Sequence, residues 1–320
     1  MNEPLLPRVA VIVLTWNQRD LTLDCLASLQ RSDYPSDRLQ IIVVDNGSAD
    51  DTAAAVHERF ASVTVIENGA NLGFAEGNDV GLRHALRGPA DYLMLLNNDT
   101  VVDPAMLSHL IAYAQAAPEV GIVTPKILYH DEPGRIWCAG NSIDWRRGTT
   151  LRLRANEPDD STHTARDVDY ATGCAICWKR QAVEQTGLLD SRFFIYYEET
   201  DWCVRARRAG WSIHYVPTAR MWHRVSAAMG TSSPATDYYM ARNVQLFLAK
   251  NLSGLARARA VVAAATRTLS TIAAYTLKPH GGARLPHRNA RLLALRDAAL
   301  GRWGKMGADV EAQCHTGVKS

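Results

Sequence analysis

The stretch Asp91-Tyr92-Leu93-Met94-Leu95-Leu96-Asn97-Asn98-Asp99-Thr100 decides the fold. An apolar run ends abruptly in Asn97, Asn98 and Asp99, which predicts a buried strand carrying an oxygen-rich tip out of a hydrophobic sheet. A hard divalent cation prefers such oxygen ligands. The same residue types also lead in ordinary turns, so taken alone the stretch favours a turn over a metal site.

The residues before this stretch repeat one pattern, in which an apolar run is followed by a segment with helical spacing. The apolar runs are 8–14, 39–44, 63–66 and 92–96, and the helical segments are 20–29, 48–60 and 77–86, with Ser48 expected as an N-cap. Strands that alternate with helices predict an α/β fold with a mostly parallel sheet and helices on both faces. Polar clusters follow each predicted strand, at the sheet edge where ligands bind in such folds.

Two of these clusters have side chains that suit a nucleotide-bearing ligand. Asp45 directly follows a predicted strand, where it could accept hydrogen bonds from a base or ribose, or equally serve as a turn residue. Segment 71–78 has glycines before a helix, which let the backbone approach a phosphate. It is neither a GxGxxG nor a Walker A sequence, so the pattern supports no dinucleotide or P-loop site.

A second acidic cluster contains Glu198, Glu199 and Asp201 and leads into an arginine-rich helix that ends at Gly210. Helix capping accounts for the charges, but not for the aromatic residues that crowd before the two glutamates. A carboxylate beside apolar rings has a raised pKa, which suits a general base. His223 follows a short strand predicted at 212–216, and it is either structural or a metal ligand beside Asp99.

The overall composition is that of a soluble globular protein of 320 residues with a net charge of +2. That balance hides an asymmetry, because residues 250–320 carry 12 Lys/Arg and only 3 Asp/Glu. The six scattered cysteines predict no disulfide framework, and Cys174 and Cys177 are expected as core residues in a strand-like run at 168–178. No signal peptide is expected, and no nucleic-acid-binding pattern accompanies the basic charge.

Taken together, the clusters resemble glycosyltransferase family 2, whose members have the GT-A fold and act with inversion, and especially its rhamnosyltransferase-like members. The matching motifs, in order over about residues 8–250, are VIVLTWN from Val11, VVDNGS from Val43, NLGFAEGN from Asn71, LNND from Leu96, TGCA from Thr172, GLLDSRFF from Gly187, the 196–210 segment, Trp222-His223 and YYMARN from Tyr238. The resemblance implies a GT-A domain over residues 1–250, followed by a basic helical extension over 251–320.

The resemblance also implies roles for individual residues. A nucleotide-sugar donor is expected to bind at Thr15, Asn17, Asp45, Asn71, Gly73, Asn78, Asn97 and Asn98. Mg²⁺ or Mn²⁺ is expected on Asp99 and His223, and the base is expected to be Glu199, with Asp201 as the fallback and Glu198 beside it. Asp190, Trp222 and Arg242 are expected on the acceptor side, where a glycan or lipid-linked acceptor binds.

Two departures from the family pattern leave other functions open. The metal motif is commonly Asp-x-Asp, but Asn97 replaces the first aspartate, and the usual Glu-Asp pair at the base is Glu198-Glu199. A non-catalytic nucleotide-sugar-binding subunit is therefore an alternative to an enzyme of cell-surface polysaccharide synthesis with a donor such as dTDP-rhamnose. A sugar-nucleotide pyrophosphorylase is disfavoured, because the segment after the first strand lacks that family's glycines.

The basic tail has two interpretations. It packs on the catalytic domain, or it attaches a cytoplasmic enzyme to the anionic inner face of the cytoplasmic membrane. Residues 260–277 are apolar but interrupted by Arg267, and they are expected to be too short to span a membrane.

Overall fold

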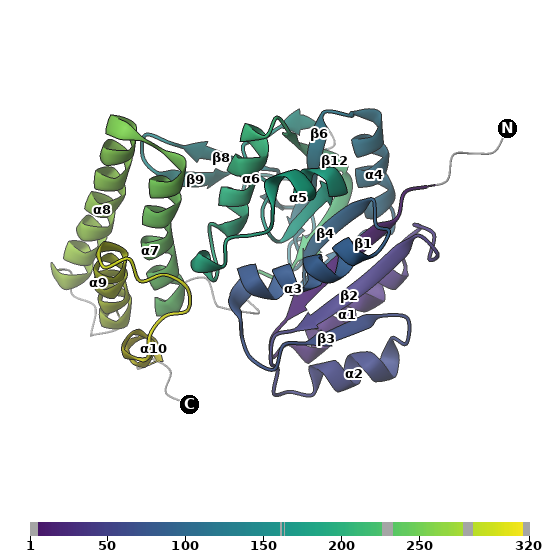
Figure 1. Cartoon of the computed structure of the whole chain (residues 1–320), viewed down its shortest axis with the longest axis horizontal. Helices are drawn as coiled ribbons and strands as arrows, with labels where there is room; N and C mark the ends of the chain where they lie inside the picture. The colour runs from purple at the N-terminus through teal and green to yellow at the C-terminus, as the bar shows by residue number, and fades with distance from the viewer. Residues whose placement is uncertain (1–5, 161, 163, 226–232, 278–283, 316–320) are drawn as a thin grey trace.

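The computed structural model describes residues 6–315 except 161, 163, 226–232 and 278–283 (Figure 1). The strands are β1 Val9–Thr15, β2 Leu39–Asp45, β3 Thr64–Glu67, β4 Tyr92–Asn97, β5 Thr100–Val102, β6 Val120–Tyr129, β7 Ile136–Cys138, β8 Asn141–Asp144, β9 Thr149–Arg152, β10 Arg166–Asp167, β11 Ala175–Lys179 and β12 Ser212–His223. The helices are α1 Arg19–Gln30, α2 Thr52–Arg59, α3 Gly73–Arg87, α4 Met106–Ala116, α5 Arg180–Thr186, α6 Glu198–Arg208, α7 Pro234–Asn251, α8 Gly254–Leu277, α9 Leu285–Ala299 and α10 Ala308–His315.

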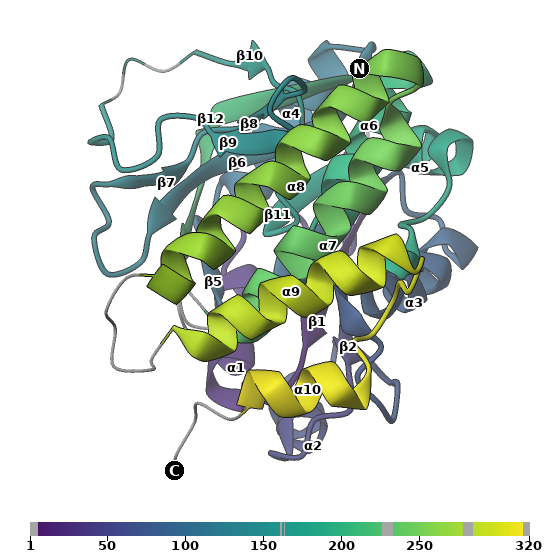
Figure 2. The same cartoon turned by 90° about the vertical axis from the view of Figure 1, so that its left-hand side faces the viewer.

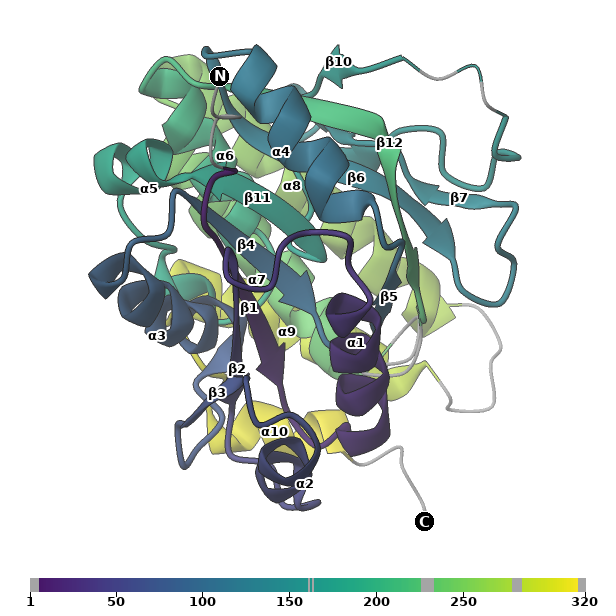
Figure 3. The same cartoon turned by 90° about the vertical axis from the view of Figure 1, so that its right-hand side faces the viewer.

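A large mixed sheet forms the centre of the molecule, with strand order β10-β12-β6-β11-β4-β1-β2-β3. Strands β4, β1, β2 and β3 are parallel, as the alternating pattern predicts, and β11 lies antiparallel between β4 and β6. Both faces of β1 are buried, because α3 packs against one face while α1, α2 and α4 cover the other (Figure 3). This is the predicted α/β architecture, and the parallel strands point their carboxyl ends to one edge.

Three local expectations are wrong. Ser48 does not cap α2, because its hydroxyl donates to Asp45 and the cap position is occupied by Asp51. Only Ala175–Lys179 of the alternating run is a strand, although Cys174 and Cys177 are buried in the core as expected. Strand β12 does not stop before Pro217 but continues to His223, with a register shift between Val216 and Arg220 that accommodates the proline.

Helices α7 to α10 form a separate layer beside the sheet, and Figure 2 shows α8 lying outermost in it. Helix α9 packs on α7, where Tyr238, Tyr239, Ala290 and Ala294 share one apolar cluster. The expectation that residues 260–277 are too short to span a membrane is wrong, because α8 has 24 residues and enough apolar character to do so by length and composition. Only 17% of its most apolar window is buried.

Candidate active site

Asp99 and His223 lie side by side because two strands pair beyond the main sheet edge. Strand β5, which directly follows Asp99, runs antiparallel to the end of β12, and Thr100 pairs with His223. The Arg224 amide donates to the Asp99 carbonyl, which fixes the register. The Nε2 atom of His223 is 3.2 Å from Oδ1 of Asp99, and each side chain is less than a tenth exposed. The unexpected length of β12 therefore creates this pair.

The pair has the chemistry of an incomplete metal site. Oδ1 of Asp99 and Nδ1 of His223 are buried, and neither atom makes a hydrogen bond, although buried polar atoms are normally paired. The only contact of Oδ1 with a donor among the described residues is the 3.2 Å approach of Nε2 of His223. A carboxylate and an imidazole suit Mn²⁺, and a carboxylate suits Mg²⁺. Among the described residues, no three or more acidic, histidine or cysteine side chains are grouped so that they could hold a metal ion. A cation here would therefore complete its shell with water and with ligand oxygens.

Glu198 and Glu199 open helix α6 after a sharp turn of the backbone. Tyr196 and Tyr197 both have positive φ angles, of 70° and 75°, which turn the chain abruptly into the helix. Burial raises the pKa of Glu199 to about 7. Burial, together with the neighbouring charge of Glu199, also raises the pKa of Glu198 well above its ordinary value. Backbone N–H groups of Gly173 and Thr200 oppose this rise at Glu199. A carboxyl group with a pKa near neutrality is suited to proton transfer.

The segment 172–174 lies between the Asn97–Asp99 turn and Glu199. The amide of Asn97, at the tip of β4, donates to the Cys174 carbonyl at 2.9 Å. One residue before Cys174, Gly173 faces Glu199 closely, since a Cβ atom there would lie 3.7 Å from Cγ of Glu199. The segment 172–174 therefore has the strand tip of Asn97 on one side and the start of α6 on the other.

A pocket of about 350 Å³ opens at this place, and we call it the Glu199 pocket. It is lined by Trp137, Asn141, Thr150, Arg152, Tyr170, Thr172, Tyr196, Tyr197, Glu199, Thr200 and Met240. The ring of Trp137 also meets the ring of His223 edge-on, with centroids 4.6 Å apart. The pocket thus extends from the candidate base to the neighbourhood of the Asp99–His223 pair.

Four lining residues escaped the sequence analysis because strands β7, β8 and β9 were not recognised: Trp137, Asn141, Thr150 and Arg152. Residues 146–169, which contain β9, carry irregular polar patterning with no clear strand period. The tryptophan and arginine in these short strands were the available signal, because tryptophan in a polar stretch commonly marks a binding surface.

On the donor side, Thr15 and Asn98 are tied to each other rather than exposed. Asn98 Nδ2 donates to the hydroxyl oxygens of both Thr15 and Thr22, at 3.2 and 3.0 Å. All three side chains are buried. They join β1, α1 and the tip of β4, so they hold the Asn97–Asp99 turn in place. Asn97 itself is half-buried at the end of β4.

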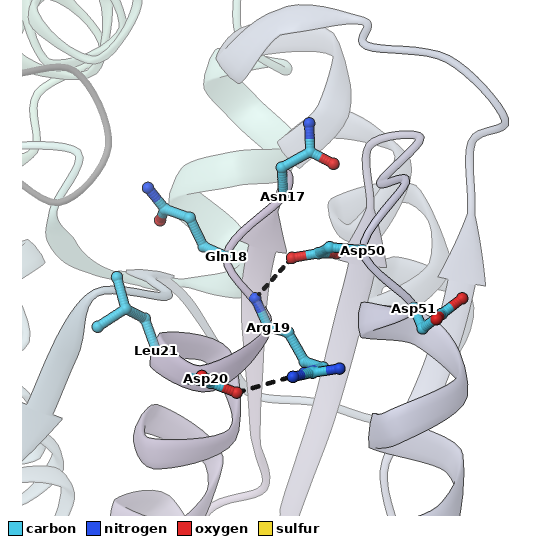
Figure 4. A pocket seen from close by; sticks show the side chains of 7 residues that line it. All are labelled: Asn17, Gln18, Arg19, Asp20, Leu21, Asp50 and Asp51. Atoms are coloured by element: carbon cyan, nitrogen blue, oxygen red, sulfur yellow. Dashed lines mark hydrogen bonds and ion pairs between the residues drawn. The ribbon is translucent and has the colours of Figure 1, made fainter. Parts of the chain in front are cut away.

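Asp45 and Asn17 shape the loop at the ends of β1 and β2. Asp45 is buried and accepts hydrogen bonds from the amide and hydroxyl of Ser48. Asn17 has a φ of 52°, and its side chain accepts from the Ala49 amide at 2.7 Å. Figure 4 shows a shallow pocket of about 470 Å³ beside this loop, lined by Asn17, Gln18, Arg19, Asp20, Leu21, Asp50 and Asp51.

Segment 71–78 is held by Asn46, a residue that the sequence analysis noted only as part of a cluster. Asn46 donates to Asn71 Oδ1 and to the Gly73 carbonyl, both at 3.1 Å, and accepts from the Leu72 amide. Gly73 has a φ of 82°, and a Cβ atom there would lie 2.5 Å from Phe194. Only glycine fits this position. Asn78 is buried and donates to the Phe74 carbonyl.

Three further predicted site residues are occupied by structural contacts and do not line the Glu199 pocket. Asp201 is fully buried and pairs with Arg205 and Lys250. Asp190 pairs with Arg192 and the same Lys250, and Arg242 is buried against tyrosine rings of α7. These side chains bind helices together. Trp222, the remaining acceptor-side residue, is half-buried next to His223, and its Nε1 atom is unpartnered.

Comparisons with known proteins identify the family and the fold. Residues 7–245 match the family model described as "Glycosyltransferase like family 2". An N-acetylglucosaminyl-diphospho-decaprenol L-rhamnosyltransferase of Mycobacterium tuberculosis is 26% identical over 245 residues, covering 69% of this chain and 78% of the relative. The dTDP-rhamnosyl transferase RfbF of Shigella flexneri is 23% identical over 259 residues, covering 76% and 80%.

Among solved structures, the mannosyltransferase PcManGT from Pyrobaculum calidifontis, in complex with GDP-Man and Mn²⁺, superposes with a TM-score of 0.57. It is 19% identical and the match covers 93% of this chain and 87% of that one. Staphylococcus aureus TarS, residues 1–349, gives a TM-score of 0.56 at 14% identity, with coverage of 91% and 80%. The order of motifs, the sheet and the matched family model lead to one conclusion: the chain is a member of glycosyltransferase family 2 with a GT-A-like fold.

Proposed function

We propose that the chain transfers a sugar from a nucleotide-sugar donor to an acceptor hydroxyl with inversion at the anomeric carbon. The observation that carries this proposal is the Glu199 pocket, which joins a carboxylate of raised pKa to the Asp99–His223 pair. The donor lies along the strand ends, near Asn17, Asp45 and the 71–78 segment. Asp99 and His223 hold Mg²⁺ or Mn²⁺, which when bound neutralises charge on the leaving nucleoside diphosphate.

In this mechanism Glu199 acts as the general base. Its unpartnered Oε2 accepts the proton of the acceptor hydroxyl, whose oxygen then bonds to the anomeric carbon. The bond between that carbon and the donor phosphate breaks on the opposite side, so the configuration inverts. The proton stays on Glu199 until it exchanges with solvent. Phe74 and Tyr197, which pack around the base, keep bulk water away from it.

The proposed donor and acceptor follow from the relatives. Two of them are named as rhamnosyltransferases, and one acts on a polyprenyl diphosphate-linked sugar. We therefore assign dTDP-rhamnose as the donor, a lipid-linked glycan as the acceptor and cell-surface polysaccharide synthesis as the process. The test is a panel of dTDP-, UDP- and GDP-sugars, in which release of nucleoside diphosphate is measured with and without Mn²⁺. Metal-dependent release supports a transferase, whereas binding without release from any donor indicates a non-catalytic subunit.

The raised pKa of Glu199 predicts how activity depends on pH. The base must be ionised to accept a proton, and burial raises its pKa to about 7. We expect kcat/KM to rise with pH through about 7 and then level off. The measurement is a pH profile of kcat/KM with a saturating metal concentration. A profile that stays flat down to about pH 5, near the pKa of an unperturbed glutamate, would contradict this role.

Helix α8 supplies the membrane contact in the proposed function. Its exposed face carries Leu255, Val262, Leu269 and Leu277, of which the first three recur every seven residues. The helix contains three arginines and no acidic residue. An apolar stripe beside positive charge is suited to an anionic lipid surface. Arg267 ties α8 to the β8–β9 turn by donating to the carbonyls of Arg147 and Gly148, so this surface lies beside a hairpin of the Glu199 pocket.

The double variant Val262→Glu/Leu269→Glu is expected to lose membrane binding. These side chains are 63% and 53% exposed, so the substitutions leave the core intact but place charge on the apolar stripe. We expect sedimentation with phosphatidylglycerol vesicles to fall at least about tenfold, since each apolar side chain contributes roughly 1.5–3 kcal/mol when buried. Leu6→Glu, on an exposed residue outside the helical layer, is the control. Equal sedimentation of the double variant and the control would exclude α8 as the contact.

A further inference from the structure

Arg152 is the one cationic side chain in the lining of the Glu199 pocket. It ends strand β9, is exposed, and places its guanidinium 4.8 Å from the centre of the Trp137 ring. No carboxylate of the described residues forms an ion pair with it. Its neighbour Arg154, in contrast, bonds to Glu157 at 2.6 Å and lies 3.7 Å from Asp160. Arg152 is thus held in position by an aromatic face while its hydrogen-bond donors are free for a ligand.

A second observation in the same pocket points to a polar ligand. Nε1 of Trp137 and Oε2 of Glu199 are both buried without a hydrogen-bond partner in the described structure. An orphaned indole N–H is a donor, and an orphaned carboxylate oxygen is an acceptor. The pocket therefore offers donors at the Trp137–Arg152 end and an acceptor at the Glu199 end. Such unpaired groups cost free energy until a ligand satisfies them.

The remaining lining suits a sugar ring between these two ends. Tyr170, Tyr196 and Tyr197 contribute aromatic surface, and Asn141 and Thr150 contribute polar groups. The volume of about 350 Å³ lies in the range of small-molecule sites, roughly 300–1,000 Å³. A hydroxyl of the ring would reach Glu199, while an anionic substituent would reach Arg152.

We propose that Arg152 binds a phosphate group of the acceptor, so that the enzyme selects acceptors whose sugar is carried on a phosphate or diphosphate ester. This proposal rests on the transfer reaction proposed above, and it specifies the acceptor class that the Glu199 pocket takes. Guanidinium is the side-chain group best matched to phosphate, which it binds through two parallel N–H donors. The Trp137 ring orients that group, and the Trp137 indole N–H adds a further donor to the same anion.

The proposal is tested by calorimetric titration of farnesyl diphosphate, and of neutral farnesol, into the full chain with EDTA present. EDTA removes metal-mediated binding of the diphosphate at Asp99 and His223. We expect farnesyl diphosphate to bind the wild-type protein more tightly than farnesol. We expect Arg152→Met to weaken diphosphate binding about 10- to 100-fold, to the level of farnesol, because a charge-assisted pair is lost. Arg152→Lys should restore only part of the affinity, since lysine offers no planar fork.

Two control variants separate this site from other sources of binding. Arg146→Met changes an exposed arginine in the β8–β9 turn, and Arg259→Met changes an exposed arginine on α8. Both should bind farnesyl diphosphate as the wild type does. Equal binding by wild type and Arg152→Met, or a loss confined to Arg259→Met, would overturn the proposal. The latter result would show that the lipid merely adheres to the helical surface.

The same variants distinguish failure of this proposal from failure of the proposed function. Metal-dependent hydrolysis of the donor is measured on the wild-type protein without any acceptor, so it tests the proposed function separately from the binding measurements on Arg152→Met. If the wild type hydrolyses a donor but farnesyl diphosphate binding does not depend on Arg152, the result supports the transferase and excludes the phosphate subsite. If farnesyl diphosphate binding depends on Arg152 but no donor is hydrolysed, the result supports the phosphate subsite and excludes the transferase.

Discussion

Replacing Glu199 with glutamine is expected to lower the transfer rate about 100- to 10,000-fold, the usual contribution of a general base. Glutamine keeps the size of the side chain and its contact with Gly173, but it cannot take up the acceptor proton at neutral pH. Donor affinity should stay within about twofold, because Glu199 accepts a proton and makes no contact with the donor in the proposed mechanism. The measurements are initial rates of transfer and calorimetric titration of the donor with Mn²⁺.

Two variants make this expectation specific. Glu184→Gln changes a half-exposed glutamate on α5 that pairs with Arg180, and it should leave the rate unchanged. Glu199→Asp installs the residue that the family commonly has at this position and should retain part of the activity, with a side chain one methylene shorter. Near-normal turnover by Glu199→Gln would remove Glu199 as the base. It would not transfer that role to Asp201, whose carboxylate is paired with Arg205 and Lys250.

The sequence predicts the sheet well where each strand is a continuous apolar run. Strands β1, β2 and β4 have both faces buried, and this leaves a pattern that needs no knowledge of tertiary contacts. The polar tips that follow these strands were predicted for the same reason. In a parallel sheet their position at the carboxyl edge is a consequence of topology alone.

The expectations fail where long-range pairing decides the structure. Proline commonly ends a strand, yet β12 passes through Pro217, because the register shift there needs no N–H donor from that residue. Whether β12 continues depends on its pairing with β5 and β6, which lie far away in sequence. Strands β7 to β9 have three or four residues each, too few to show a period. These strands contribute Trp137, Asn141, Thr150 and Arg152 to the Glu199 pocket. These four lining residues were therefore not predicted, although Glu199 was.

Helix α2 illustrates how a local rule was overridden. Ser48 is a residue type that caps helices, and it precedes a helical segment at suitable spacing. In the structure its hydroxyl and amide both bind the carboxylate of Asp45, which lies buried at the end of β2. A buried carboxylate gains more from two donors than a solvated helix end gains from one cap.

The second large effect is expected from Asp99→Ala. In the proposed function Asp99 is the only carboxylate at the metal, because Asn97 stands where the family commonly has another aspartate. We expect the substitution to remove the Mn²⁺ dependence of donor binding and to weaken that binding at least about 100-fold. Losing a residue that only hydrogen-bonds to a metal ligand typically lowers metal affinity about 10- to 100-fold, and losing the ligand itself should cost more. The measurement is titration of the nucleoside diphosphate with and without Mn²⁺, which does not depend on turnover.

Asn97→Asp is the matched opposite of this variant, because it adds the missing carboxylate two residues away on the same turn. A second anionic oxygen ligand strengthens binding of a hard divalent cation, so less Mn²⁺ should be needed for half-maximal donor binding. His223→Ala should fall between Asp99→Ala and the wild type, because it removes a neutral ligand and leaves the charge of Asp99 in place. If a cation is held at this turn, Asn97→Asp should strengthen Mn²⁺-dependent donor binding and Asp99→Ala should weaken it. If Asp99→Ala instead unfolds the chain while Asn97→Asp leaves the Mn²⁺ requirement unchanged, the 3.2 Å contact between Asp99 and His223 is a structural link between β5 and β12 and not a metal site.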